Sequence, residues 1–237
     1  MPIPFALNPA LDATALARRF ARDGRVRIAD LLSRETAEAL HAGLRGRGDW
    51  RHVVNSGAKV IELSRAARAD MTEAQRRQLD DAVYAAARTG FQFRYETLRV
   101  PDGNAERRQG DDPLFAFADW FSQGAARDLL RRITATPQID FSDAQATAFA
   151  PGDFLTGHDD VVDGRKRHAA YVLGLNPIWR PEWGGLLLFH DADGLVGQTP
   201  AFNTLDVFRV GQLHSVSEVT RAAAYRRYSI TGWLRSR

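Results

Sequence analysis

The 237-residue chain contains no cysteine. This absence excludes disulfide bonds, thiolate metal sites and cysteine nucleophiles, and it argues against a secreted disulfide scaffold. The apolar runs are short, so no segment is expected to cross a membrane. The first residues, from Met1 to Phe5, lack a basic stretch followed by an apolar core, so we expect no signal peptide. The resulting prediction is a cytoplasmic location.

Lysine is also scarce. Among 32 basic residues only Lys59 and Lys166 are lysine, and the 29 acidic residues leave a formal net charge of +3. Arginine is interspersed with aspartate and glutamate instead of forming blocks, which is typical of solvated surfaces. The charge pattern therefore gives no argument for a nucleic-acid partner.

The remaining composition is that of an ordinary globular protein, with 44% hydrophobic and 10% aromatic residues. A chain of this length favours one domain with a sizeable core. No internal repeat, low-complexity segment or clear linker divides it. We therefore predict a single domain over residues 1–237, with helical support and flanking strands over about 1–137 and a β-rich core over about 138–237.

Helical spacing and capping residues dominate the first half of the chain. Helices are expected over 11–22, 33–44, 72–89, 113–121 and 125–133. Alternating segments predict strands over 25–31 and 91–97 and a hairpin over 50–63. The polar segment 101–112 is predicted to be a loop, either a mobile cover over a substrate or an ordinary solvated connection.

The second half changes to short strand-like runs separated by Gly, Pro, Asn and Asp. The runs cover 144–149, 169–175, 186–189, 204–210, 215–219 and 225–234. This spacing predicts an antiparallel sandwich or barrel. The predicted fold class is α+β with a mainly β core, a double-stranded β-helix (jelly roll) supported by N-terminal helices.

Four side chains in this half suggest a chemical site: His158, Asp160, His214 and Arg227. On an extended segment His158 and Asp160 would point the same way, because side chains alternate along a strand, whereas Asp159 would point away. His214 follows 56 residues later, so the fold must bring it back. Two imidazoles and one carboxylate suit non-haem Fe(II) with open coordination positions. The guanidinium of Arg227 suits a carboxylate.

The sequence around these residues carries a family resemblance. The segments are Gly-His-Asp-Asp at 157–160, Trp-Gly-Gly at 183–185, His-Ser-Val at 214–216 and Arg-Tyr-Ser-Ile-Thr-Gly-Trp at 227–233. Together they resemble the Fe(II)/2-oxoglutarate-dependent dioxygenases, within them the prolyl-4-hydroxylase-like branch and especially the yeast and bacterial hydroxylases of a ribosomal-protein proline. The resemblance is tight over about 140–237 and looser over about 20–140.

Several roles are implied by this resemblance. His158, Asp160 and His214 match the iron ligands, Arg227 matches the residue that pairs with the distal carboxylate of 2-oxoglutarate, and Thr231 falls where relatives place a hydroxyl near that carboxylate. The implied cofactors are Fe(II), 2-oxoglutarate as co-substrate and ascorbate as a candidate reductant. The implied reaction is hydroxylation of a C–H bond, in a prolyl residue of a peptide or protein, with release of succinate and CO2.

Two departures keep alternatives open. Relatives often carry tyrosines that hold the co-substrate where this chain has Phe149 and Gly174. One alternative is a hydroxylase of a small molecule, such as a free amino acid or metabolite. Others are a non-catalytic jelly-roll binding module and a metal-dependent isomerase or hydrolase. The last two would have no use for Arg227.

Overall fold

The computed structural model describes residues 4–57, 59–108 and 111–236. Within them, thirteen strands form one curled sheet in which all pairings are antiparallel. The strands are β1 (Arg25–Ile28), β2 (Arg51–Ser56), β3 (Lys59–Ser64), β4 (Phe93–Arg99), β5 (Phe141–Ser142), β6 (Gln145–Phe149), β7 (Phe154–His158), β8 (Arg167–Leu175), β9 (Leu187–Asp191), β10 (Gly194–Gln198), β11 (Phe202–Arg209), β12 (His214–Val216) and β13 (Arg227–Arg235).

The strand order explains how distant segments meet. Along the sheet the strands follow one another as β1-β11-β8-β13-β6-β4-β7-β12-β9-β10, with β2 and β3 extending from β4 and β5 pairing with β13. This is the predicted double-stranded β-helix. The first half contributes four strands to the sheet: β1 beside β11, β4 between β6 and β7, and the pair β2 and β3. The assignment of residues 1–237 to one domain stays a prediction.

The helices follow the capping residues closely. They are α1 (Ala13–Asp23), α2 (Arg34–Gly46), α3 (Arg65–Ala69), α4 (Glu73–Ala87), α5 (Asn104–Arg107), α6 (Pro113–Phe121) and α7 (Gly124–Thr134), with a 3₁₀ turn at Pro181–Trp183. The side chain of Ser33 caps α2, and Thr72 forms a capping box with Gln75 at the start of α4. Gly24 ends α1 in a left-handed conformation, with φ of 67°.

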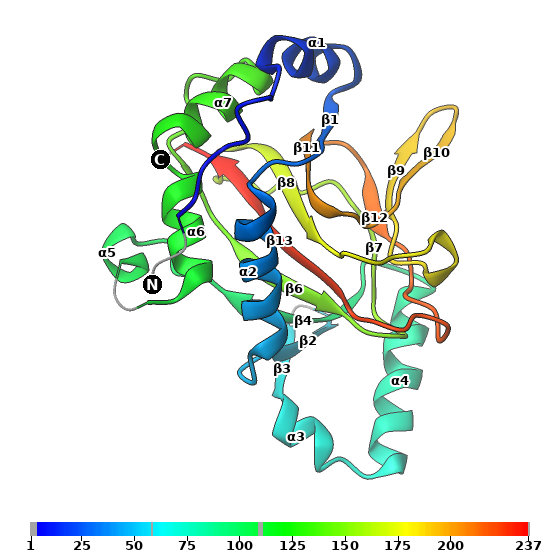
Figure 1. Cartoon of the computed structure of the whole chain (residues 1–237). Coiled ribbons are helices and arrows are strands. Elements are labelled where there is room, and N and C mark those ends of the chain that lie inside the picture. Colours follow the sequence, from blue (N-terminus) through cyan, green and yellow to red (C-terminus); the bar gives the residue numbers. More distant parts are fainter. Residues whose placement is uncertain (1–3, 58, 109–110, 237) are drawn as a thin grey trace.

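The main core lies between these helices and the outer face of the sheet. Figure 1 shows α2 lying across β13 and β6, with α6 and α7 beside it. Apolar side chains from α1, α2, α6 and α7, including Phe20, Leu40, Phe117 and Leu130, pack against Leu173 and other residues of the sheet. The predicted supporting helices are therefore present, and they leave the inner face of the curled sheet open.

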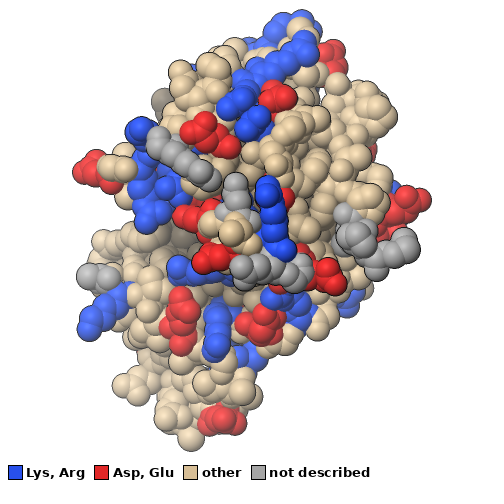
Figure 2. All heavy atoms as spheres, turned by 90° about the vertical axis from the view of Figure 1, so that its left-hand side faces the viewer, with Lys and Arg blue, Asp and Glu red and all other residues tan. Residues whose placement is uncertain are grey.

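Charged side chains of both signs share the surface of the molecule. Figure 2 shows basic and acidic side chains interspersed over one face of the molecule. Among the described residues, no helix combines the length and apolarity needed to traverse a bilayer.

One local prediction was wrong. Residues 101–112 were expected to be a loop, but they contain α5, with residues 109 and 110 outside the described part. Arg107 is 2% exposed, and its Nη1 donates to the carbonyl oxygens of Ala118 and Ser142. A long-range anchor of this kind leaves no local pattern in the sequence. None of the described residues of this segment lines the cavity discussed below, so the described part offers no support for a cover.

Candidate metal and co-substrate site

A cavity of about 400 Å³ opens on the inner face of the sheet. Its walls come from β4, β6, β7, β8, β9, β11, β12 and β13 and are mostly apolar. All five residues singled out from the sequence line it, namely His158, Asp160, His214, Arg227 and Thr231. The fold thus brings together side chains that lie far apart in the chain.

The two histidines face each other across neighbouring strands. His158 ends β7, His214 begins β12, and the two residues are partners in the strand register, with ring centroids 4.1 Å apart. Each ring donates its Nδ1 hydrogen to a backbone carbonyl, of Thr156 at 3.0 Å and of Gln212 at 2.8 Å. Since a carbonyl oxygen only accepts, each Nε2 is left with a lone pair, as a metal ligand requires.

The carboxylate of Asp160 completes this group. Its oxygens lie 3.6 Å from Nε2 of His158 and 3.4 Å from Nε2 of His214. The three potential ligand atoms are all within 4.8 Å of one another. Such a set fits a divalent metal of the iron type with three protein ligands. Sequence and structure therefore select the same three residues as candidates.

The expected reason for the orientation of Asp160 was wrong. Strand β7 ends at His158, so strand alternation does not apply to Asp160, which has a φ of 65°. The left-handed bend turns its carboxylate toward the histidines. Nη1 of Arg167 donates to the Asp160 carbonyl at 3.1 Å, and the Arg167 guanidinium lies 3.5 Å from the ring centroid of Trp233. Asp159 is exposed and accepts a hydrogen bond from the amide of Val161.

Burial favours the metal-binding form of one histidine. Burial lowers the pKa of His214, and the neighbouring His158 ring lowers it further, while Asp160 opposes them. A neutral imidazole is the form that binds a metal, so proton competition at His214 is reduced.

Arg227 is a buried cation with no carboxylate at ion-pair distance among the described residues, although the charge of Asp206 raises its pKa. It is 4% exposed, its Nη1 donates to Oγ of Ser229 at 3.2 Å, and its guanidinium lies 5.2 Å from the ring centroid of Phe149. Burial lowers the pKa of Arg227 to about 10. Among the described residues its Nε has no hydrogen-bond partner and no carboxylate forms an ion pair with it. A buried unpaired charge is unfavourable unless a ligand neutralises it, and a carboxylate would do so.

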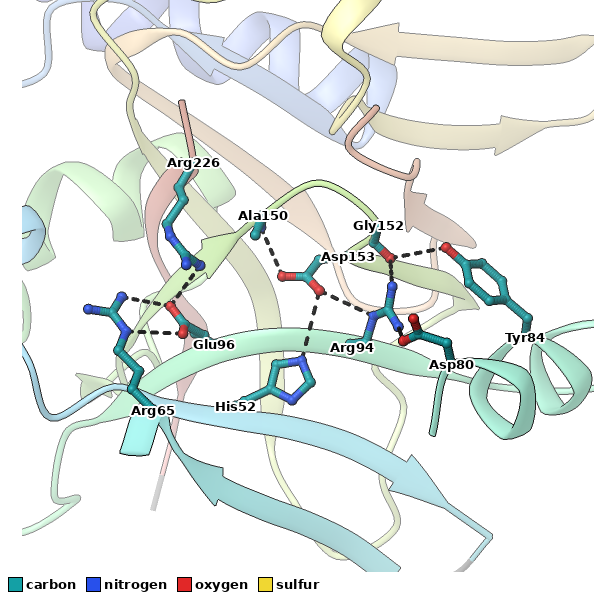
Figure 3. A network of polar contacts seen from close by, with 10 residues as sticks. All are labelled: His52, Arg65, Asp80, Tyr84, Arg94, Glu96, Ala150, Gly152, Asp153 and Arg226. Carbon is teal, nitrogen blue, oxygen red and sulfur yellow. Dashed lines mark hydrogen bonds and ion pairs between the residues drawn. The ribbon is translucent and has the colours of Figure 1, made fainter. Parts of the chain in front are cut away.

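The neighbouring Arg226 forms an ion pair on the other side of the sheet. It pairs with Glu96 at 3.0 Å, and Glu96 also binds Arg65 at 2.7 Å (Figure 3). Burial alone would raise the pKa of Glu96, but hydrogen bonding to Arg65 and the charge of Arg226 together lower it. Of the two adjacent arginines, only Arg227 is available to a ligand in the cavity.

Hydroxyl groups surround Arg227. Oγ1 of Thr147 lies 3.0 Å from Oγ of Ser229, and Thr231 continues the same face of β13. Arg227 and Thr231 were expected at the site from the sequence, whereas Thr147 and Tyr95, which also line the cavity, were not. The available signal was the alternation in the runs 91–97 and 144–149, which puts Tyr95 and Thr147 on inward-facing positions.

Comparisons with known proteins agree with this site. Residues 144–235 match the family model described as the 2OG-Fe(II) oxygenase superfamily. Prolyl 3-hydroxylase OGFOD1 of Mus musculus is 33% identical over 126 residues, which cover 49% of this chain and 21% of that protein. Prolyl 3-hydroxylase sudestada1 of Drosophila melanogaster is 31% identical over 122 residues, which cover 45% and 22%. The chain therefore spans about a fifth of the length of these curated relatives.

The fold has solved counterparts. A prolyl-4-hydroxylase of Pseudomonas putida superposes with a TM-score of 0.62, covering 95% of this chain and 99% of that one at 21% sequence identity. The fold and the His–Asp–His group agree with the match of residues 144–235 to the 2OG-Fe(II) oxygenase superfamily. Both curated relatives are named prolyl 3-hydroxylases, and the solved structure from Pseudomonas putida is named a prolyl-4-hydroxylase.

Proposed function

We propose that the protein is an Fe(II)- and 2-oxoglutarate-dependent dioxygenase that hydroxylates a C–H bond, in a prolyl residue of a peptide or protein, and releases succinate and CO2. The observation that carries the proposal is the coexistence of two features in one cavity. One is the His158–Asp160–His214 group, and the other is the buried and unpaired Arg227. A metal site alone would need no such cation.

Iron would be held by Nε2 of His158, Nε2 of His214 and the carboxylate of Asp160. When bound, iron together with 2-oxoglutarate and dioxygen supplies the oxidising power for hydroxylation. The chain contributes orientation, because both rings are fixed through Nδ1 and Asp160 is fixed through Arg167.

Arg227 would bind the distal carboxylate of 2-oxoglutarate, with hydroxyls of Ser229 and Thr231 nearby. Its low exposure strengthens this pairing, because a charge-assisted hydrogen bond is stronger where water is excluded. The apolar walls, which include Leu155, Val172 and Phe208, keep water from the reacting atoms.

The rim of the cavity is suited to an uncharged substrate ring. Phe91, Val161 and Val162 line the cavity and are 48%, 57% and 43% exposed. Exposed apolar groups beside a site are typical of a binding surface. The two curated relatives are both named prolyl 3-hydroxylases, which supports a prolyl substrate.

The test combines co-substrate turnover with a substrate comparison. Iron-loaded protein given 2-oxoglutarate and oxygen should release succinate, and proline-containing peptides should increase the rate and gain one oxygen atom by mass spectrometry. His214→Ala and Asp160→Ala should abolish both signals, whereas Asp159→Ala should keep them. Free proline and an alanine-substituted peptide serve as substrate controls. A fully active Asp160→Ala variant, or turnover of free proline in preference to every peptide, would contradict the proposal.

A further inference from the structure

Three side chains form a row across three adjacent strands. In the register Glu96 of β4 faces Ala148 of β6, and Arg227 of β13 faces Phe149 of β6, so Tyr95 lies beside Phe149. The rings of Tyr95 and Phe149 are stacked with centroids 5.0 Å apart and an interplanar angle of 21°. Arg227 approaches the same Phe149 ring. The row Tyr95–Phe149–Arg227 thus faces the cavity.

Neither of the two positions where relatives often carry tyrosine can supply a hydroxyl here. Position 149 is phenylalanine. At Gly174 a Cβ atom would lie 2.5 Å from the backbone oxygen of Ala201, so no side chain fits without moving the backbone. Two other tyrosines, Tyr95 and Tyr171, line the cavity, and Tyr171 already donates its hydroxyl to the carbonyl of Asp143 at 2.8 Å. Tyr95 carries the other tyrosine hydroxyl in the described wall, and its partner there is the side chain of Gln145, which also lines the cavity.

Ion pairs and hydrogen bonds hold strand β4 through Arg94 and Glu96 (Figure 3), the two residues that flank Tyr95 in the sequence. Arg94 binds Asp80, donates to the carbonyl of Gly152 at 2.6 Å and lies 3.3 Å from Asp153. Glu96 is held by Arg65 and Arg226. Because Arg94 and Glu96 flank Tyr95 and point the other way, these ion pairs fix the backbone from which Tyr95 projects.

We propose that the hydroxyl of Tyr95 donates a hydrogen bond to a carboxylate oxygen of 2-oxoglutarate, in place of the tyrosines missing at positions 149 and 174. The inference rests on the proposed function, since it assigns a residue to the same co-substrate. Tyr95 is a positioning residue that would act beside Arg227.

The hydroxyl is in the right protonation state to donate. Burial raises the pKa of Tyr95; hydrogen bonding to Gln145 opposes this effect, and the charge of Asp160 adds to it. The phenol therefore keeps its proton at neutral pH. The stack with Phe149 holds the ring in place, so little side-chain entropy is lost when a ligand binds.

The experiment measures 2-oxoglutarate binding without turnover. Full-length protein loaded with Mn(II) is titrated with 2-oxoglutarate by isothermal calorimetry, and Mn(II) affinity is measured separately. Tyr95→Phe keeps the ring and removes only the hydroxyl, so we expect about a tenfold weaker Kd for 2-oxoglutarate and an unchanged Kd for Mn(II). The matched control is Tyr84→Phe, because Tyr84 contacts Gly152 on the opposite face of β4 (Figure 3). It should bind like the wild type.

A second variant moves the hydroxyl from position 95 to position 149. The double variant Tyr95→Phe with Phe149→Tyr should recover much of the lost affinity, because the hydroxyl returns to the position used by relatives. Tyr95→Phe binding within twofold of the wild type would overturn this inference alone. A wild-type protein that binds Mn(II) but not 2-oxoglutarate would overturn the proposed function and this inference with it.

Discussion

Replacing Arg227 by methionine should make the ligand-free protein more stable while removing co-substrate binding. Methionine has a similar length and carries no charge. The guanidinium is 4% exposed and has no acidic partner among the described residues, so folding transfers an unpaired cation out of water. The substitution removes this penalty.

The size of the effect follows from the pKa of Arg227, which burial lowers from its usual value in water to about 10. The arginine is charged in both the folded and the unfolded state at neutral pH, so the lowered pKa is a penalty on folding of about 3 kcal/mol. The contact with Phe149 offsets about 1 kcal/mol of it. The expected net gain is about 2 kcal/mol, or a rise of about 4–8 °C in Tm.

The assay is a thermal unfolding curve of metal-free protein, repeated with Mn(II) and 2-oxoglutarate. The wild type should gain stability from the co-substrate and Arg227→Met should not. The adjacent Arg226→Met is the matched control: it leaves Glu96, which is 1% exposed, with one partner fewer and should lower Tm. The reasoning would be refuted if Arg227→Met lowered Tm as much as Arg226→Met does, because Arg227 would then be stabilising the fold.

Three further predictions test other parts of the structure. The partners of Glu96 lower its pKa below 4.5, so Glu96 contributes its full stabilisation to the fold above pH 4.5. Glu96→Gln should therefore lower the chemical-denaturation midpoint at pH 7, and the difference from the wild type should shrink as the pH falls further below 4.5. Gly174→Ala should lower the free energy of unfolding by about 2 kcal/mol, because the added Cβ would clash with the backbone oxygen of Ala201. Gly48→Ala is the control: its added Cβ would lie in open space, so the same denaturation assay should show almost no change. Arg167→Met should weaken Co(II) binding severalfold, measured by visible absorption, because it frees the Asp160 carbonyl; an unchanged affinity would show that the bend after β7 holds by itself.

The sequence predicted well wherever a local rule was sufficient. Ser33, Thr72 and the Asp112–Pro113 pair start helices in the structure because capping depends on a few neighbouring residues. Four of the predicted strand-like runs are strands in the structure, namely β6, β8, β11 and β13, because a strand pattern also depends on neighbouring residues. The jelly-roll fold is confirmed, and the five predicted site residues share one cavity, although their assignment as ligands stays a prediction.

The features that the sequence did not predict depend on contacts between distant segments or on an unusual backbone conformation. Strand β7, which carries His158, was not predicted because its pairing with β4 and β12 stabilises a short segment that has no strong pattern. The orientation of Asp160 depends on a left-handed bend, which L-residues rarely adopt. Tyr95 was predicted only to lie in a strand, because its place beside Phe149 depends on the order of the strands in the sheet.

The direct pairing of His158 with His214 also bears on the lifetime of the protein. Strand β12 has only three residues and β7 has five, so this edge of the cavity has few backbone hydrogen bonds to keep it closed. A metal ion shared by both strands would act as a removable crosslink and, at a concentration 100 times its Kd, would add about 2.7 kcal/mol of stability. Proteases attack chains that open locally, so degradation of the protein would slow as iron becomes plentiful. The same ion would then govern both the rate of the proposed reaction and the survival time of each copy of the protein.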